Sequence, residues 1–152
     1  TPQPKAKYAK KRLVHVDHLM LYRPLFAVGA TVTLRTDSKP LRDYALGQFA
    51  AAGYDTLWVS DDVRRDHPEH PETEYECRTR EMGAVVYGIC ATPGEKPTEE
   101  QLVAGRAQEQ SLACYLPDNL DELTYVPLGM EEAVENFRNR ARKGKKRLPQ
   151  ES

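Results

Sequence analysis

The chain has 152 residues, a length typical of one domain, and its 39% apolar and 30% charged residues fit a soluble domain with extra polar segments. No apolar run approaches the roughly 20 residues that cross a bilayer, so we expect no membrane-spanning segment. The three cysteines, Cys77, Cys90 and Cys114, are odd in number and have no short-range pairing, which excludes a disulfide framework and a four-thiolate zinc site.

Basic residues gather at the two ends of the chain. Residues 1–12 and 138–147 hold 12 of the 22 lysines and arginines and no acidic residue, whereas residues 13–137 hold 10 basic and 22 acidic residues. Basic ends attract phosphate through counterion release and screened Coulomb attraction. The alternative is a pair of solvated ends without structure. We predict RNA contacts from Lys5, Lys7, Lys10, Lys11, Arg12, Arg138, Arg140, Arg142, Lys143, Lys145, Lys146 and Arg147.

The first half of the chain predicts a β-α-β unit. Residues 13–28 are rich in apolar side chains, and their type is ambiguous. Residues 31–36 (TVTLRT) alternate between apolar and polar side chains and predict a strand. Asp37 and Ser38 can cap the helix that follows, whose apolar residues recur at helical spacing until a glycine ends it. Residues 55–60 (DTLWVS) predict the second strand.

Two alternatives are open for the next segment. Residues 61–72 contain two His-Pro pairs and predict a loop, because proline removes a backbone donor and biases the preceding residue toward extended conformations. Alternation within residues 73–79, with Gly83 before the apolar residues 84–91, favours a β-hairpin. The other possibility is a helix over 72–82 that leads into a single strand.

The last third of the chain predicts two helices. Thr98 and Gln101 match a capping box, which opens the first of them. Residues 112–127 are mixed and contain short extended pieces. A final helix over 130–142 then carries an apolar stripe, which predicts a buried face. The stripe consists of Met130, Ala133, Val134, Phe137 and Ala141.

With the hairpin, the order of elements is that of the thioredoxin fold. The chain resembles the thioredoxin-like mitochondrial ribosomal proteins, a family shared with a small accessory subunit of respiratory complex I. The segments that carry this resemblance are VTLRT (32–36), LRDYALGQFAAAGYD (41–55), ETEYECRTREMGAVVYGICA (72–91) and TEEQLVAGRAQE (98–109). It implies an α/β fold, a thioredoxin-like three-layer sandwich over 31–111. Residues 1–30 would form a basic N-terminal extension with an apolar segment, and residues 112–152 a C-terminal extension with an amphipathic helix and a basic tail.

Two pairs of histidines have the spacing of metal ligands. His67 and His70 could form a three-ligand set with Cys77, but histidines between prolines in a loop are more often solvated. His15 and His18 could line one side of a helical turn, but such residues more often belong to a packed or surface segment. Neither pair therefore predicts a metal site.

The acidic run within residues 61–76 could hold a divalent cation, since hard cations prefer carboxylate oxygens. Such a run more often faces solvent or a basic protein partner. The first predicted helix also lacks the C-x-x-C of redox-active thioredoxins, so a dithiol reaction has no residues to carry it. We therefore predict no catalytic, cofactor-binding or metal-binding residue and no cofactor.

The resemblance and the basic ends together imply a function. We expect a non-enzymatic structural subunit, most simply a mitochondrial ribosomal protein whose ends contact ribosomal RNA and whose body contacts neighbouring ribosomal proteins. The alternative is an accessory subunit of respiratory complex I. Both imply a mitochondrial location and no small-molecule substrate. A third class, a small α/β enzyme acting on nucleotides, corresponds to a flavodoxin-like unit in which 72–82 is helical.

Overall fold

The protein has a mixed α/β fold around a small sheet. The computed structural model describes residues 3–147, apart from the side chains of residues 122, 141 and 144–147. The sheet has three strands in the order β1-β3-β2. The strands are β1 (Val32–Thr36), β2 (Tyr54–Ser60) and β3 (Tyr87–Pro93). Because β3 is antiparallel to both neighbours, β1 and β2 run parallel to each other on either side of it.

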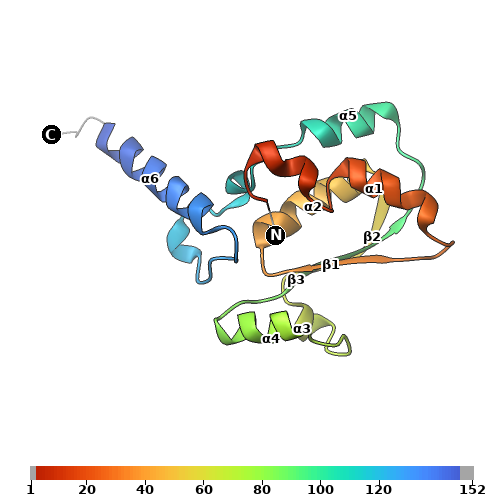
Figure 1. Cartoon of the computed structure of the whole chain (residues 1–152), viewed down its shortest axis with the longest axis horizontal. Helices are drawn as coiled ribbons and strands as arrows, with labels where there is room; N and C mark the ends of the chain where they lie inside the picture. Colours follow the sequence, from red (N-terminus) through yellow and green to blue (C-terminus); the bar gives the residue numbers. More distant parts are fainter. Residues whose placement is uncertain (1–2, 148–152) are drawn as a thin grey trace.

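Three helices cover one face of the sheet (Figure 1). They are α1 (Val16–Tyr22), α2 (Lys39–Ala51) and α5 (Glu99–Ala107). Local signals start two of them as expected, because Ser38 caps α2 and Thr98 opens α5 with a capping box. The core lies between α2 and the sheet and includes Tyr44, Ala45, Phe49, Tyr54, Ile89 and Ala91.

The opposite side of the sheet carries a short helix, α3 (Val63–Asp66), and α4 (Glu74–Glu81). The predicted β-hairpin is therefore wrong, and the alternative helix is confirmed. Thr73 and Glu76 form a capping box: the Thr73 hydroxyl accepts from the Glu76 backbone N–H at 3.1 Å, and the Glu76 carboxylate accepts from the Thr73 backbone N–H at 3.4 Å. With one strand in place of two, the structure does not confirm the thioredoxin-like sandwich.

Short 3-10 helices occupy both flanks of this body. η1 (Ala6–Lys11) and η2 (Arg23–Leu25) lie before the sheet in sequence, on either side of α1. η3 (Leu112–Tyr115) and η4 (Leu120–Glu122) follow α5. Of the extended pieces predicted within 112–127, the first is replaced by η3, whereas Leu123 is extended; no described residue of this segment pairs with a strand of the sheet.

The final helix, α6 (Glu131–Arg147), extends away from the body (Figure 1). Its base is anchored as the apolar stripe predicts, because Met130 and Val134 are buried and Phe137 packs against the core. The side chain of Ala141, the last member of the stripe, is outside those described. The basic residues after 138 belong to this helix and do not form the separate tail expected after residue 142. Among the described residues, no helix has the length and apolar character needed to cross a membrane.

Candidate functional site

The carboxyl ends of β1 and β2 meet at one edge of the sheet, because the two strands are parallel. Asp37 follows β1 and Asp61 follows β2. In open α/β sheets, ligands bind in the crevice beyond the carboxyl ends of the strands. A ligand site is therefore expected at this edge.

Arg42 organises the β2 side of this edge. Its buried guanidinium donates to the backbone oxygen of Ser60 at 2.8 Å and to the Asp61 carboxylate at 2.7 Å. It also donates to Asp43 at 2.9 Å and lies 5.3 Å from the centre of the Tyr87 ring. The hydrogen bond from Arg42 lowers the pKa of Asp61, so this carboxylate stays ionised.

Asp37 lies at the centre of the β1 side. One of its carboxylate oxygens accepts from the Tyr125 hydroxyl at 2.9 Å and from the Leu128 backbone N–H at 3.2 Å. Burial, and then the Asp37 carboxylate, raise the pKa of Tyr125, which stays a neutral donor. A segment 88 residues further along the chain thus crosses the end of β1.

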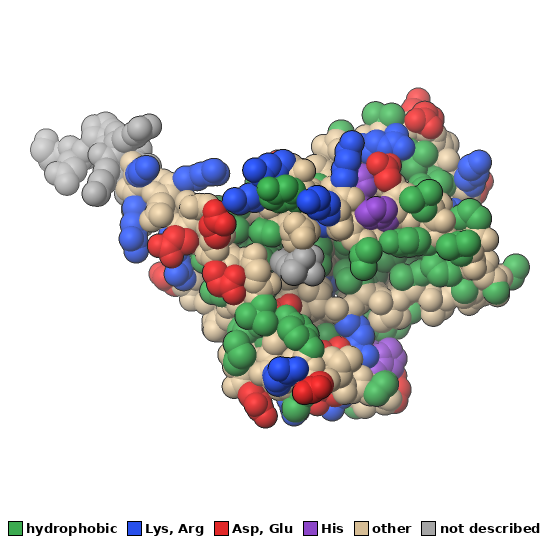
Figure 2. Space-filling model, in the orientation of Figure 1, with side chains coloured by type: hydrophobic (Ala, Val, Ile, Leu, Met, Phe, Trp, Pro, Cys, Tyr) green, Lys and Arg blue, Asp and Glu red, His purple; other side chains and the backbone are tan. Residues whose placement is uncertain are grey.

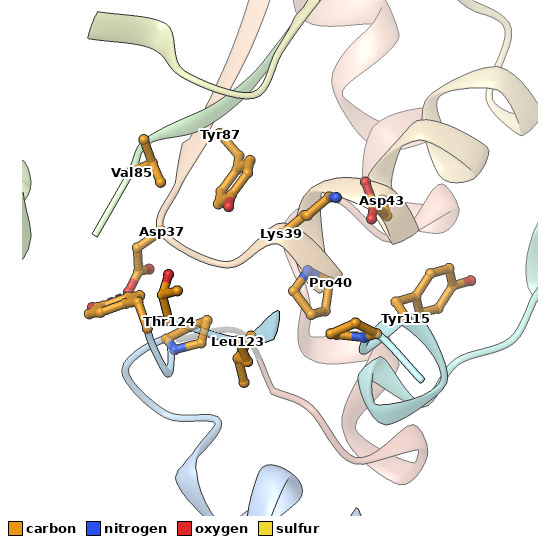
Figure 3. A pocket seen from close by; sticks show the side chains of 12 residues that line it. Asp37, Lys39, Pro40, Asp43, Val85, Tyr87, Tyr115, Leu123 and Thr124 are labelled. Carbon is orange, nitrogen blue, oxygen red and sulfur yellow. Dashed lines mark hydrogen bonds between the residues drawn. The ribbon is translucent and has the colours of Figure 1, made fainter. Parts of the chain in front are cut away.

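These contacts frame a cavity of about 260 Å³, which we call the Asp37 hollow (Figure 3). Lys39 and Asp43 border it from α2, and Tyr87 borders it from the start of β3. The segment before α6 closes the other side with Leu123 and Thr124. The hollow therefore combines carboxylates, an ammonium group and an aromatic ring.

A second cavity, of about 300 Å³, borders Asp37 from the side of α4. Arg35 and Glu76 form an ion pair there at 2.6 Å, with side chains that are 19% and 9% exposed. Thr73 and Tyr75, from the start of α4, complete this cavity. Tyr75 has its pKa raised by burial and by the nearby Asp37 carboxylate. The capping box thus places the first turn of α4 beside Asp37.

Groups of this kind suit a planar, hydrogen-bonding ligand. Carboxylate oxygens accept hydrogen bonds from N–H donors, as on the edge of a nucleobase. Aromatic and guanidinium planes stack on bases that are not paired.

The two basic ends, far apart in sequence, lie side by side. Lys5 and Arg140 border one cavity of about 420 Å³ between η1 and α6, which we call the basic groove. Tyr8 and Phe137 contribute its apolar walls, and Lys5 contacts Glu132 at 3.2 Å. Figure 2 shows Lys and Arg side chains along α6 and over the N-terminal segment. The exposed members of the predicted set are Lys5, Lys7, Lys10, Lys11, Arg138, Arg140, Arg142 and Lys143.

Arg12 differs from the rest of that set. Its side chain is buried, donates to the backbone oxygen of Gln3 at 2.7 Å and lies 4.5 Å from the centre of the Tyr44 ring. Burial lowers the pKa of its guanidinium. A phosphate contact would require Arg12 to leave this position. Lys145, Lys146 and Arg147 lie in α6, but their side chains are outside those described.

The two histidine pairs have different surroundings. His67 and His70 lie side by side, and Glu69, not the Cys77 that the sequence offers as a possible third ligand, joins them in a cluster. His15 is buried at the start of α1, and its ring centre is 6.5 Å from that of His18.

Arg35 and Tyr125 carry no motif, Glu76 belongs to a capping-box string, and the pattern around Asp37 predicts only a helix cap. One further signal is present in the sequence: Asp37 directly follows the first strand of a β-α-β unit, where ligands collect. Tyr125 offers no such signal, because a distant loop brings it to Asp37.

No family model matches the chain, but curated proteins do. It is 32% identical over 92 residues to a protein of Streptococcus equi subsp. zooepidemicus, covering 60% of this chain and 44% of that protein. Identity to a protein of Lysinibacillus sphaericus is 32% over 89 residues, which cover 58% of this chain and 41% of that protein. A protein of Alkaliphilus oremlandii is 33% identical over 91 residues, which cover 59% of this chain and 43% of that protein. Each relative is named tRNA (guanine-N(7)-)-methyltransferase, and the chain spans less than half of its length.

These relatives overturn the expected function. The resemblance to mitochondrial ribosomal and complex I proteins is wrong, because the proteins matched are named as enzymes that modify tRNA. The expectations of a non-enzymatic structural subunit, of ribosomal or complex I partners and of no small-molecule substrate are wrong for the same reason. The resemblance depended on a hairpin that is a helix. The mitochondrial location, which rested on it, stays an untested prediction.

Proposed function

We propose that the chain takes part in methyl transfer to N7 of a guanine in tRNA, and that the Asp37 hollow holds this guanine. The similarity to relatives named for this activity carries the proposal. The position of the hollow, beyond the carboxyl ends of two parallel strands, supports it. We also propose that the sheet belongs to a methyltransferase-like α/β fold, since β1, α2 and β2 form the βαβ unit typical of nucleotide-binding sheets.

This reaction depends on the orientation of the guanine and on negative charge near it more than on a general base that accepts a proton. The lone pair of guanine N7 attacks the methyl carbon of a donor molecule, whose leaving atom keeps the electron pair of the broken bond. No proton has to leave N7, which is an acceptor in guanine. The methylated ring gains a positive charge, and carboxylates fixed nearby stabilise that charge as it develops.

Asp37 is the residue that we assign to guanine binding. Its carboxylate accepts hydrogen bonds, and the N1–H and amino groups of guanine offer adjacent donors on one edge. A base held by that edge points its N7 edge away from the carboxylate. Tyr87 borders the hollow and could stack on the base, and Tyr75 lies in the second cavity beside Asp37.

The basic groove is the surface that we assign to the tRNA backbone. Lys5 and Arg140 border the groove from opposite ends of the chain. Phosphate contacts from such side chains position a nucleic acid without reading its sequence. We therefore retain the predicted RNA contacts from the exposed lysines and arginines of η1 and α6.

The test is methylation of a tRNA transcript. The protein is mixed with a donor that carries a labelled methyl group, and label in the RNA is measured. We expect incorporation into a normal transcript and none into a transcript made with 7-deazaguanosine, which lacks the accepting nitrogen. Asp37→Asn should slow incorporation on the order of 10²-fold, because it removes a fixed charge from the site. The matched control, Asp118→Asn, changes an exposed aspartate outside both cavities.

Two outcomes would contradict the proposal. The first is no incorporation by the wild-type protein, or equal incorporation into the 7-deazaguanosine transcript. The second is an Asp37→Asn variant that keeps its circular dichroism spectrum and methylates as fast as the Asp118→Asn control.

A further inference from the structure

The segment between β2 and α4 brings two histidines and a glutamate together on the surface. The ligand atoms of His67, Glu69 and His70 all lie within 4.8 Å of one another. The Glu69 carboxylate oxygen is 3.4 Å from Nδ1 of His67 and 3.8 Å from Nε2 of His70. Imidazole nitrogen and carboxylate oxygen are ligands that suit zinc and neighbouring transition metals.

These separations are close to those around a bound ion. Zinc binds nitrogen and oxygen at about 2.0–2.2 Å with tetrahedral geometry, which places neighbouring ligand atoms about 3.3 Å apart. The separations of 3.4 Å and 3.8 Å exceed that value by about 0.1 Å and about 0.5 Å. Rotation of the exposed Glu69 side chain can shorten both of these separations, and the two histidine nitrogens lie within 4.8 Å of each other.

The imidazoles are held in place before any ion arrives. The His67 ring stacks on Trp58 of β2, with ring centres 4.0 Å apart and planes 28° apart. The His70 backbone N–H donates to the His67 oxygen at 3.1 Å, which forms the turn that sets the two rings together. Arg64 donates to the His70 backbone oxygen at 3.2 Å. A site whose two imidazoles are already ordered loses less conformational entropy when it binds.

The surrounding charges favour a cation. Glu69 brings a carboxylate, an anionic ligand, up to the two imidazoles. The two nearby arginines are paired with carboxylates: Arg65 contacts Asp66 at 2.8 Å and Arg64 contacts Glu72 at 3.8 Å. Their charge is therefore partly neutralised.

We propose that His67, Glu69 and His70 form a zinc-binding site that orders this loop, with a water molecule as the fourth ligand. A bound ion would join both histidines to Glu69, and one of these histidines, His67, stacks on Trp58. The site is independent of the Asp37 hollow and of the proposed methyl transfer, because none of its ligands borders that hollow.

Trp58 allows the site to be observed directly, because it is the only tryptophan in the chain. Co²⁺ is titrated into the metal-free protein, and the quenching of tryptophan fluorescence and the visible absorption of the bound ion are recorded. Zn²⁺ is then added as a competitor and also titrated in a calorimeter. We expect one equivalent of Co²⁺ to quench Trp58 and Zn²⁺ to reverse the quenching.

Variants separate this site from other metal-binding groups. Glu69→Gln changes an exposed side chain, and we expect it to weaken Zn²⁺ binding at least about tenfold, since even indirect partners of a metal contribute about 10- to 100-fold. His67→Asn should weaken binding more strongly. His18→Asn and Glu74→Gln are the matched controls, because both residues lie outside the cluster.

Two results would overturn the proposal. One is the absence of saturable quenching and heat up to millimolar Zn²⁺ or Co²⁺. The other is an equal loss of affinity in Glu69→Gln and in the two controls, which would mean that the ion binds diffusely to the acidic surface.

Discussion

The ring of His15 caps the start of α1 and is also buried in the protein. Its Nδ1 accepts from the backbone N–H of Asp17 at 3.1 Å, which caps the helix, and its side chain is almost fully shielded from solvent. An accepting nitrogen carries no proton, so the cap requires the neutral ring. Burial accordingly lowers the pKa of His15 below its ordinary 6.5, against an opposing effect from Asp17.

This arrangement predicts a pH dependence of stability. Below pH 6.5 the unfolded chain binds a proton at His15 that the native protein binds only at lower pH. The contribution of His15 is therefore complete above pH 6.5 and is lost as the pH falls toward the pKa of the folded state. Urea unfolding at pH 7 and pH 5 should show a smaller pH dependence in His15→Asn, because asparagine also caps helices but does not titrate.

The same pH dependence in wild type and His15→Asn would contradict this assignment. His18→Asn is the matched control, since His18 lies next to His15 but is only partly buried. Its removal should leave most of the dependence in place.

At the scale of elements, α4 shows what a local pattern can and cannot decide. The string from Thr73 to Glu76 has the same form as the string from Thr98 to Gln101, and both open helices with reciprocal hydrogen bonds. No other pattern contradicts a helix after Thr98. After Thr73, by contrast, the alternation of side chains and Gly83 together favour a hairpin. Gly83 has a φ of +93° and ends α4, with its N–H bonded to Arg80, so the glycine marks a helix end where the pattern predicts a hairpin turn.

Two Thr-to-Ala changes test the capping of α4. Thr73→Ala removes the acceptor for the Glu76 N–H and should lower the free energy of unfolding by about 1 kcal/mol. Thr98→Ala makes the same change in α5 and should cost a similar amount. Urea denaturation measures both, and Thr73→Ser should retain most of the stability because serine also caps.

A Thr73→Ala variant as stable as wild type would show that α4 does not depend on this cap. The paired Thr98→Ala variant ensures that the assay detects a missing cap of this size.

At the scale of the molecule, individual helices and strands can be predicted from the sequence, but the contacts between elements distant in sequence cannot. The strands near 31–36 and 55–60, the helix after Ser38 and the helix after Thr98 follow from short patterns that their own residues satisfy. The insertion of β3 between β1 and β2 joins residues far apart in sequence, so no local pattern encodes it. The hydrogen bond from Tyr125 to Asp37 is hidden from sequence reasoning for the same reason.

The meeting of the two basic ends predicts how RNA binding depends on salt. Replacing Arg138, Arg140, Arg142 and Lys143 with glutamine should weaken tRNA binding and leave the fold intact, because these side chains are exposed on α6. The negative slope of log affinity against log salt concentration should become shallower by about 0.7–0.9 for each phosphate that the variant no longer neutralises. Fluorescence anisotropy with a labelled tRNA at several salt concentrations measures this slope.

Arg78→Gln with Arg80→Gln removes positive charge from α4, away from the basic groove, and serves as the control. An α6 variant whose slope equals that of wild type and of this control would show that α6 does not bind phosphates.

The strand order also has a consequence for folding. β3 lies at the centre of the sheet but is the last of the three strands to leave the ribosome, so β1 and β2 emerge without a partner. Its ladder joins Val32 to Ala91 and Tyr54 to Pro93, and both pairings close long loops whose entropy must be lost first. Non-local pairing of this kind slows folding. Because β3 is the partner of both β1 and β2, neither ladder of the sheet can form until β3 is in place.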